Sequence, residues 1–172
     1  ARVTLLRDLG SALAPDNAFG IIQGLETVAL RMKQHCYNAE KVVNYLKSHK
    51  EITKIIYPTN HKGEIAQRAK KYLNGGYGGL VGIELKGGIK AGKKFIEALK
   101  MFYHVANIGD ARSLAIHPAS TTHSQLNEKE LLASGVTQGY VRLCIGLEHI
   151  DDIIEDLDQA LNKSSTSTLK AV

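Results

Sequence analysis

Three groups of residues have side-chain types that could support chemistry, and Arg142 is the first of them. It lies in the stretch YVRLCIGLE, where its planar guanidinium could hold a carboxylate through two parallel hydrogen bonds. An arginine among such apolar or small neighbours needs a partner, because an unpaired interior charge is costly. That partner could be a ligand carboxylate, as in an amino acid or a keto acid. It could equally be an Asp or Glu of this chain, which spacing alone favours.

The second group is the segment HPASTTHSQL, in which His117 and His123 flank a run of hydroxyl side chains. A zinc site needs three or four ligands, whereas Pro118 and the Ser/Thr run favour an ordered loop that is hydrogen-bonded to its own backbone. Cys36 and Cys144 form no CxxC pair and have no base next to them in the sequence. We therefore predict no metal ligands and no nucleophilic thiol.

The third group is the glycine cluster GGYGGLVG, residues 75–82. It precedes a predicted strand instead of joining a strand to a helix, and no GK[ST] follows, so a dinucleotide-binding loop and a P-loop are both excluded. An RNA-binding strand would need further aromatic residues where Leu80, Val81 and Ile83 stand. The cluster is predicted to be a turn.

The composition is that of a globular protein with one domain. Of the 172 residues, 44% are hydrophobic and 23% are charged, and no apolar run is long enough to cross a membrane. The early apolar stretch contains charges and does not resemble a signal peptide. The net charge of +5 is spread over predicted helices, so we expect no nucleic-acid partner. The two cysteines fit a reducing compartment and predict a cytoplasmic protein. A chain that starts at Ala1 suggests a piece cut from a longer one.

A long amphipathic helix is the strongest periodic signal, and it is predicted over residues 17–48. Asp16 and Asn17 are expected to cap it, and Pro15 is expected to prevent an earlier start. At 1.5 Å per residue such a helix is about 45 Å long, so its apolar stripe should reach beyond one small domain. The stripe consists of Ala18, Ile22, Leu25, Ala29, Met32, Cys36, Ala39, Val43 and Leu46.

The rest of the chain alternates short strands and helices. Strands are predicted over residues 53–57, 80–85, 103–106, 113–116 and 140–145, and helices over 61–71, 90–100, 127–135 and 150–161. Asn127 and Glu130 predict a capping box. The pattern predicts an α+β fold with helices packed on one face of a small, mainly antiparallel sheet. Alternation along 140–145 puts Arg142 on the face opposite Val141 and Leu143.

Four long motifs together resemble the C-terminal part of the Cys/Met-metabolism pyridoxal-phosphate enzymes. They are PDNAFGIIQGLETVALRMKQHCYNAEKV, KYLNGGYGGLVGIELKGG, HVANIGDARSLAIHPASTTHSQL and GVTQGYVRLCIGLEHIDDIIEDLDQAL, and the resemblance covers Leu5 to Leu161. It implies the small C-terminal domain of a fold-type I transferase. Residues 1–16 would be a remnant of the junction with the large domain, residues 17–163 the small domain with its long connecting helix, and residues 164–172 a frayed tail.

The resemblance also implies which parts lie outside this chain. Members of the family bind pyridoxal phosphate in a large N-terminal domain that carries the Schiff-base lysine, an aspartate facing the pyridinium nitrogen and the phosphate-binding loop. None of those motifs occurs here, so we assign no catalytic, cofactor-binding or metal-binding residue. We expect the fragment alone to bind no cofactor and to be inactive. Its expected partners are the large domain and further copies of the full-length chain, as a tetramer.

Within the family, the motifs are most similar to the O-acetylhomoserine sulfhydrylases. The resemblance implies that Arg142 binds the substrate α-carboxylate, and that Asn107, Ile108 and Arg112 also contact the substrate. Asn107 falls where the cystathionine enzymes usually have a serine whose backbone approaches that carboxylate. Arg112 falls where those enzymes often carry a glutamate for a distal amino group, which argues against a cystathionine-type substrate. The implied reaction replaces the acetate of O-acetylhomoserine by sulfide or a thiol, giving homocysteine or methionine. A methionine γ-lyase, a cystathionine enzyme and a non-catalytic binding module stay open as alternatives.

Overall fold

The structure is a computed structural model that describes residues 2–165, and its backbone divides into two compact units, Ala1–Arg31 and Met32–Val172. The first unit contains the π-helix η1 (Arg2–Asp8) and the helix α1 (Pro15–Glu26), neither of which has a buried residue. The second unit contains the sheet and the core. Among the described residues, no helix is both long and apolar enough to cross a bilayer.

The helix predicted over residues 17–48 is divided in two, which corrects the prediction. Helix α1 ends at Glu26 and α2 (Val28–Leu46) follows, with Thr27 in a turn. The guanidinium of Arg31 donates to Thr27 Oγ1 at 2.7 Å and to the Gly24 carbonyl at 2.9 Å. The Arg31 side chain thus bonds to Thr27 in the turn and to the Gly24 carbonyl just before it. Gly24 and the β-branched residues Thr27 and Val28 also lower the helix propensity of this segment.

The predicted N-cap of the first helix is also wrong. Ala14 occupies the N-cap position without a side-chain cap, and Pro15 is the first helical residue. Proline is well tolerated there, since the N–H it lacks would have no partner within the helix. Asp16 therefore lies in the first turn of α1 and does not cap the helix. A carboxylate in this turn interacts favourably with the helix dipole.

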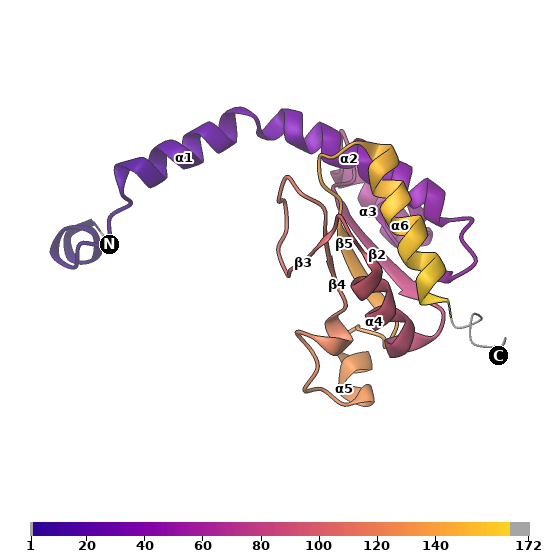
Figure 1. The fold of residues 1–172 in the computed structure, drawn as a ribbon. Helices are drawn as coiled ribbons and strands as arrows, with labels where there is room; N and C mark the ends of the chain where they lie inside the picture. Colours follow the sequence, from indigo (N-terminus) through magenta and orange to yellow (C-terminus); the bar gives the residue numbers. More distant parts are fainter. Residues whose placement is uncertain (1, 166–172) are drawn as a thin grey trace. The chain divides into compact units, whose positions relative to one another are not determined.

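A five-stranded sheet organises the second unit, in the order β1-β2-β5-β4-β3. Strands β1 (Ile52–Ile56), β2 (Leu80–Leu85), β5 (Tyr140–Cys144) and β4 (Leu114–Ile116) pair antiparallel with their neighbours. Only β3 (Tyr103–His104) pairs parallel, with β4. All five strands lie where the sequence predicts them, and the predicted, mainly antiparallel α+β architecture is confirmed (Figure 1).

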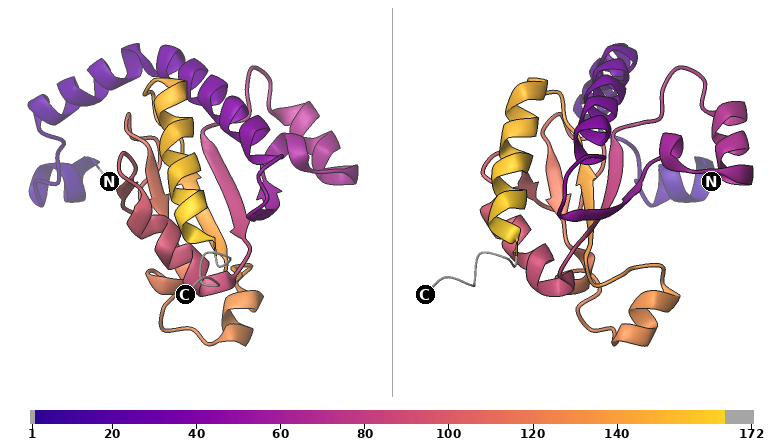
Figure 2. Two further views of the ribbon diagram at one scale, coloured as in Figure 1. Left: turned by 45° about the vertical axis from the view of Figure 1, so that its right-hand side comes forward. Right: turned by 90° about the vertical axis from the view of Figure 1, so that its right-hand side faces the viewer.

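Three helices cover one face of this sheet and enclose the core (Figure 2). Helix α2 contributes its C-terminal half, and α4 (Gly88–Ala98) and α6 (Ile150–Ser164) lie beside it. Val81, Val141 and Leu143 of the sheet are fully buried against them. The other large buried side chains of this core include Leu46, Phe95, Ile83, Ile145, Ile153, Leu157 and Leu161.

The other face of the sheet is covered less completely. Helices α3 (Gly63–Tyr72) and α5 (Glu128–Ala133) lie toward that side (Figure 2). The predicted capping box starts α5, with Asn127 Oδ1 accepting from the Glu130 N–H at 3.1 Å and Glu130 Oε2 accepting from the Asn127 N–H at 2.8 Å. Two short 3₁₀ helices, η2 (Pro58–Asn60) and η3 (Pro118–Ser120), complete the described elements.

The tail was predicted to be frayed from residue 164 onward, which is wrong for its first two residues. Ser164 belongs to α6 and is buried, and its hydroxyl donates to the Leu161 carbonyl at 2.8 Å. Ser165 is also buried and donates to Glu51 Oε1 at 2.9 Å. The polar composition of this segment suggested solvent exposure, but one local and one long-range hydrogen bond hold its first two residues. Residues 166–172 of the predicted tail lie outside the described residues.

Candidate functional site

Arg142 lies on the less covered face of β5, opposite the helices, as the alternation of the strand predicts. Across the sheet it faces Gly82 of β2 and Ile116 of β4. Its Nη2 donates to the Asn107 carbonyl at 3.3 Å, and its Nε is buried without a hydrogen-bond partner among residues 2–165. No carboxylate of those residues forms a salt bridge with it. The intramolecular ion pair that spacing favoured is therefore absent from the described part of the chain.

Asn107 is brought to Arg142 by the segment between β3 and β4. Its carbonyl accepts from the guanidinium and also from Cys144 Sγ, at 3.1 Å. Ile108, the next residue, is 61% exposed and lines a cavity of about 220 Å³ together with Cys144. The structure thus brings Arg142 and Asn107, two of the residues predicted to bind substrate, into contact, and Ile108 follows Asn107 directly.

Cys144 has the properties of a structural thiol. It is buried, its side chain donates to a backbone carbonyl, and burial raises the pKa of its thiol. A raised pKa lowers the fraction of thiolate, the nucleophilic form. Cys36 accepts from the Gly78 N–H at 3.3 Å, and both cysteines are free.

Arg112 is engaged with its own neighbours. Its guanidinium lies over the ring of Tyr103, 4.3 Å from the centroid, and its Nε is 3.5 Å from Asp110 Oδ1. The backbone N–H of Arg112 also donates to Asp110 Oδ1 at 3.1 Å, and this bond holds the pKa of that carboxyl below its usual range. Arg112 is not bonded to Arg142 or Asn107, so its predicted contact with substrate stays a prediction.

A larger cavity opens on the same face of the sheet as Arg142. It has a volume of about 610 Å³ and lies between α3 and strands β1, β2 and β5. Its lining is mostly aliphatic and aromatic, and Arg142 of β5 and Arg68 of α3 are the two arginines on its wall. No lysine lines this cavity or the smaller one beside Ile108. The residues there therefore suit a carboxylate with an apolar body, and they do not fit the covalent attachment of pyridoxal phosphate.

The segment with two histidines is structural, as predicted. His117 is fully buried between two partners, with Nδ1 2.8 Å from Ser120 Oγ and Nε2 2.8 Å from the Gln138 carbonyl. The ring Nδ1 of His123 lies 2.9 Å from the neighbouring Thr122 hydroxyl, and the backbone N–H of His123 donates to the Pro118 carbonyl at 2.9 Å. Within residues 2–165, no group of His, Cys, Asp or Glu could hold a metal ion.

We expect the stability of the protein to fall when the pH drops below about 6.5, partly because of His117. Burial lowers the pKa of this imidazole, so the unfolded chain binds the proton more readily than the folded chain. The stabilisation is present above the unfolded pKa and is lost as the pH falls through the lower folded value. Urea unfolding between pH 5 and pH 7.5 measures this dependence. The His117→Gln variant should be less stable at neutral pH but less dependent on pH.

His61→Gln is the matched control, because His61 follows η2, is only partly buried and is not one of the groups that shift the pKa of His117. This variant should keep the pH dependence of the parent. An equal slope for the parent and for His117→Gln would contradict the assignment to His117.

Several residues that shape the site carry no recognisable sequence signal. Ser113 and Asn38 are fully buried, and Glu148 is partly buried behind the loop that carries Asn107. The Ser113 N–H and hydroxyl both donate to the Glu148 carboxylate, at 2.6 and 2.9 Å. These partners are 35 residues apart in the sequence, so no local pattern could have revealed them.

Comparison with known proteins places this geometry among pyridoxal-phosphate enzymes. A family model described as "Cys/Met metabolism PLP-dependent enzyme" matches residues 1–162. An O-acetyl-L-homoserine sulfhydrylase of Leptospira meyeri is 53% identical over 162 residues, covering 94% of this chain and 37% of that protein. An L-methionine gamma-lyase of Fusobacterium nucleatum subsp. polymorphum is 43% identical, covering 92% of this chain and 40% of that protein.

A solved structure has the same fold. It is described as an O-acetylhomoserine (thiol)-lyase from Campylobacter jejuni carrying a pyridoxyl-lysine monophosphate group. It matches with a TM-score of 0.83 and 46% identity, over 93% of this chain and 38% of that one. The chain thus spans 37–40% of the length of these relatives.

Proposed function

The chain belongs to the Cys/Met metabolism PLP-dependent enzymes, and we propose that it is the substrate-carboxylate-binding C-terminal domain of an O-acetylhomoserine sulfhydrylase. In this proposal residues 17–163 form the small domain, with residues 1–16 at its junction with the large domain. The large domain belongs to the same, longer chain, and the full-length enzyme is a cytoplasmic homotetramer. The large domain supplies the cofactor, because the cavities beside Arg142 offer no lysine to hold it.

One observation carries the proposal: the buried, unpartnered Nε of Arg142 beside a cavity. A buried N–H without a partner is costly, and a substrate carboxylate would satisfy it. The guanidinium can offer Nε–H and the parallel N–H of Nη2 to the two carboxylate oxygens, while the other N–H of Nη2 donates to the Asn107 carbonyl. The hydrogen bond to the Asn107 carbonyl restrains the guanidinium before substrate binds, so that the side chain loses less conformational freedom on binding.

The residues of this chain orient the substrate, and the cofactor does the electronic work. When bound, pyridoxal phosphate acts as an electron sink that lets an amino acid lose protons and its leaving group. Arg142 fixes the carboxylate end of the substrate, so that rotation about the bonds of the α-carbon is restricted. Such orientation contributes to the rate as well as to binding.

The assay that tests the proposal uses the full-length enzyme containing this chain. With O-acetylhomoserine, sulfide and pyridoxal phosphate we expect release of acetate and formation of homocysteine, whereas the 172-residue chain alone should release none. Methionine γ-lyase activity is the second candidate, on the 43% identity to the Fusobacterium enzyme. Release of methanethiol from methionine, without turnover of O-acetylhomoserine, would favour that candidate and contradict the first.

A further inference from the structure

A buried hydrogen-bond network lies behind the loop that carries Asn107, and the proposed function does not yet use it. We call it the Glu148 network; it consists of Asn38, Ser113, Gly146 and Glu148. Glu148 accepts both donors of Ser113, its N–H at 2.6 Å and its hydroxyl at 2.9 Å. The Ser113 hydroxyl in turn accepts from the Gly146 N–H at 2.9 Å. The network therefore joins the end of the loop to the segment that follows Arg142 on β5.

Helix α2 completes the network from a third direction. Asn38, fully buried, donates to the carbonyls of Gly146 and Glu148, at 2.9 and 3.0 Å. The Leu147 N–H donates to the Ala111 carbonyl at 2.8 Å. Three segments distant in sequence are thus held at one place, which lies at the end of the loop opposite Asn107.

Gly146 is required for this close approach. A Cβ built on Gly146 would lie 2.2 Å from Glu148 Oε2, 2.5 Å from the Ser113 nitrogen and 2.6 Å from the Ala111 carbonyl oxygen. Two of these three atoms belong to the backbone and cannot move away independently. At this point the segment after β5 can therefore approach the backbone of residues 111–113 so closely only because residue 146 has no side chain.

The two ends of the loop thus have different anchors. At one end the carbonyl of Asn107 accepts from Arg142 and Cys144, and at the other end Ser113 is held by Glu148. Asn107 and its neighbours up to Gly109 are exposed, so few other contacts hold the loop.

From this geometry we infer that Glu148 is a positioning residue for the substrate-binding arginine, acting through Ser113 and the loop 107–113. The inference rests on the proposed function, because it assumes that Arg142 binds the substrate carboxylate. Glu148 itself touches neither Arg142 nor Asn107 in the described residues, and its effect is to fix where the Asn107 carbonyl meets the guanidinium.

The test compares Glu148→Ala with Glu148→Gln in the full-length enzyme. The alanine leaves the Ser113 N–H without a partner, and we expect the KM for the amino-acid substrate to rise about tenfold, the equivalent of about 1.4 kcal/mol. The KM for sulfide and the absorbance of the bound cofactor should stay unchanged. Glutamine keeps one acceptor oxygen for Ser113, so its KM should lie nearer the parent value.

Glu155→Ala is the matched control, since Glu155 is exposed on α6 and should leave both KM values unchanged. If Glu148→Ala raised both KM values equally, or lowered only kcat and thermal stability, Glu148 would be a structural residue and the inference would be wrong. Arg142→Ala separates this failure from that of the proposed function. If Arg142→Ala left the amino-acid KM unchanged, the proposed function would fail whatever Glu148 does.

Discussion

Replacement of Arg142 by alanine is expected to raise the KM of the full-length enzyme for its amino-acid substrate by tenfold to a hundredfold or more. A hydrogen bond to a charged group contributes about 1.5–3 kcal/mol, and a guanidinium forms two with one carboxylate. The binding of the cofactor should not change, because no lysine that could attach it covalently lines the cavity of Arg142 or the smaller cavity beside Ile108. Steady-state kinetics together with the cofactor absorbance spectrum measure both quantities.

Two further variants make this result specific. Arg142→Lys keeps the positive charge but loses the planar fork, so its KM should lie between those of the parent and the alanine variant. Lys94→Ala removes an exposed cation of α4, on the face of the sheet opposite Arg142, and it should leave the KM almost unchanged. An unchanged KM in Arg142→Ala would remove the observation on which the proposed function rests.

The face of the sheet that carries Arg142 could be predicted from the sequence because the signal is local. Successive side chains of a strand point to opposite faces, and Val141 and Leu143 are apolar. The structure buries both of them completely and leaves Arg142 on the other face. The capping box of Asn127 and Glu130 is local in the same way, since both partners lie within one helical turn.

The parts that could not be predicted depend on contacts between distant segments or on competition between local signals. Nothing near Glu148 indicates that its carboxylate accepts from Ser113, 35 residues away. At Thr27 the apolar spacing of four and three continues across a turn, and the turn is stabilised by the side chain of Arg31. Periodicity reports which face is apolar, and it does not report where the backbone of a helix is interrupted.

The partner of Arg142 also illustrates why the sequence-based prediction and the structure differ. Spacing favoured a carboxylate partner within the chain, since a buried arginine is usually paired. The structure supplies a backbone carbonyl on one side and leaves Nε unpartnered in the described residues. A sequence lists the charges, but only the fold determines which of them lie within reach of each other.

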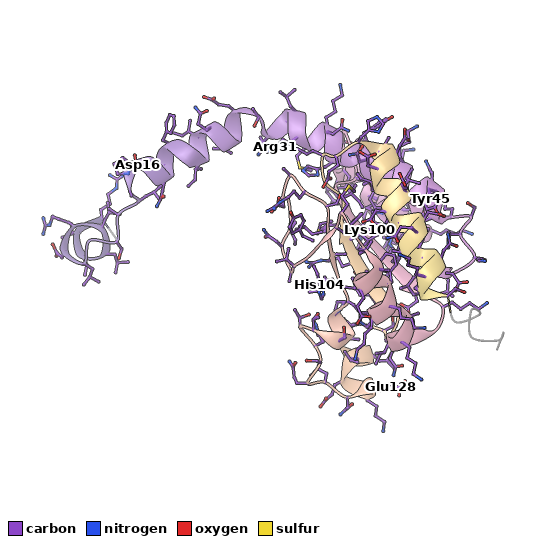
Figure 3. All side chains as sticks on the ribbon, viewed as in Figure 1. Asp16, Arg31, Tyr45, Lys100, His104 and Glu128 are labelled. Atoms are coloured by element: carbon purple, nitrogen blue, oxygen red, sulfur yellow. The ribbon has the colours of Figure 1, made fainter. Side chains whose placement is uncertain are left out.

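The largest expected effect on stability is at Asp156, a buried residue of α6. Its carboxylate accepts from three successive backbone N–H groups after α4, those of Lys100, Met101 and Phe102, at 2.9, 2.9 and 3.2 Å. Figure 3 places Lys100 beside α6. Because β3 and the Asn107 loop follow directly, this carboxylate also fixes where the segment that leads to the site begins.

Asp156→Ala is expected to lower the free energy of unfolding by about 3 kcal/mol or more, because each buried donor left without a partner costs about 1–3 kcal/mol. For a chain of this size the melting temperature should fall by roughly 6–12 °C. Urea unfolding of the 172-residue chain, followed by circular dichroism, measures the change. Asp152→Ala removes an exposed carboxylate from the first turn of the same helix, and it should cost no more than about 1 kcal/mol. Equal midpoints for the two variants would show that the three N–H groups find other partners, and that the start of β3 does not depend on α6.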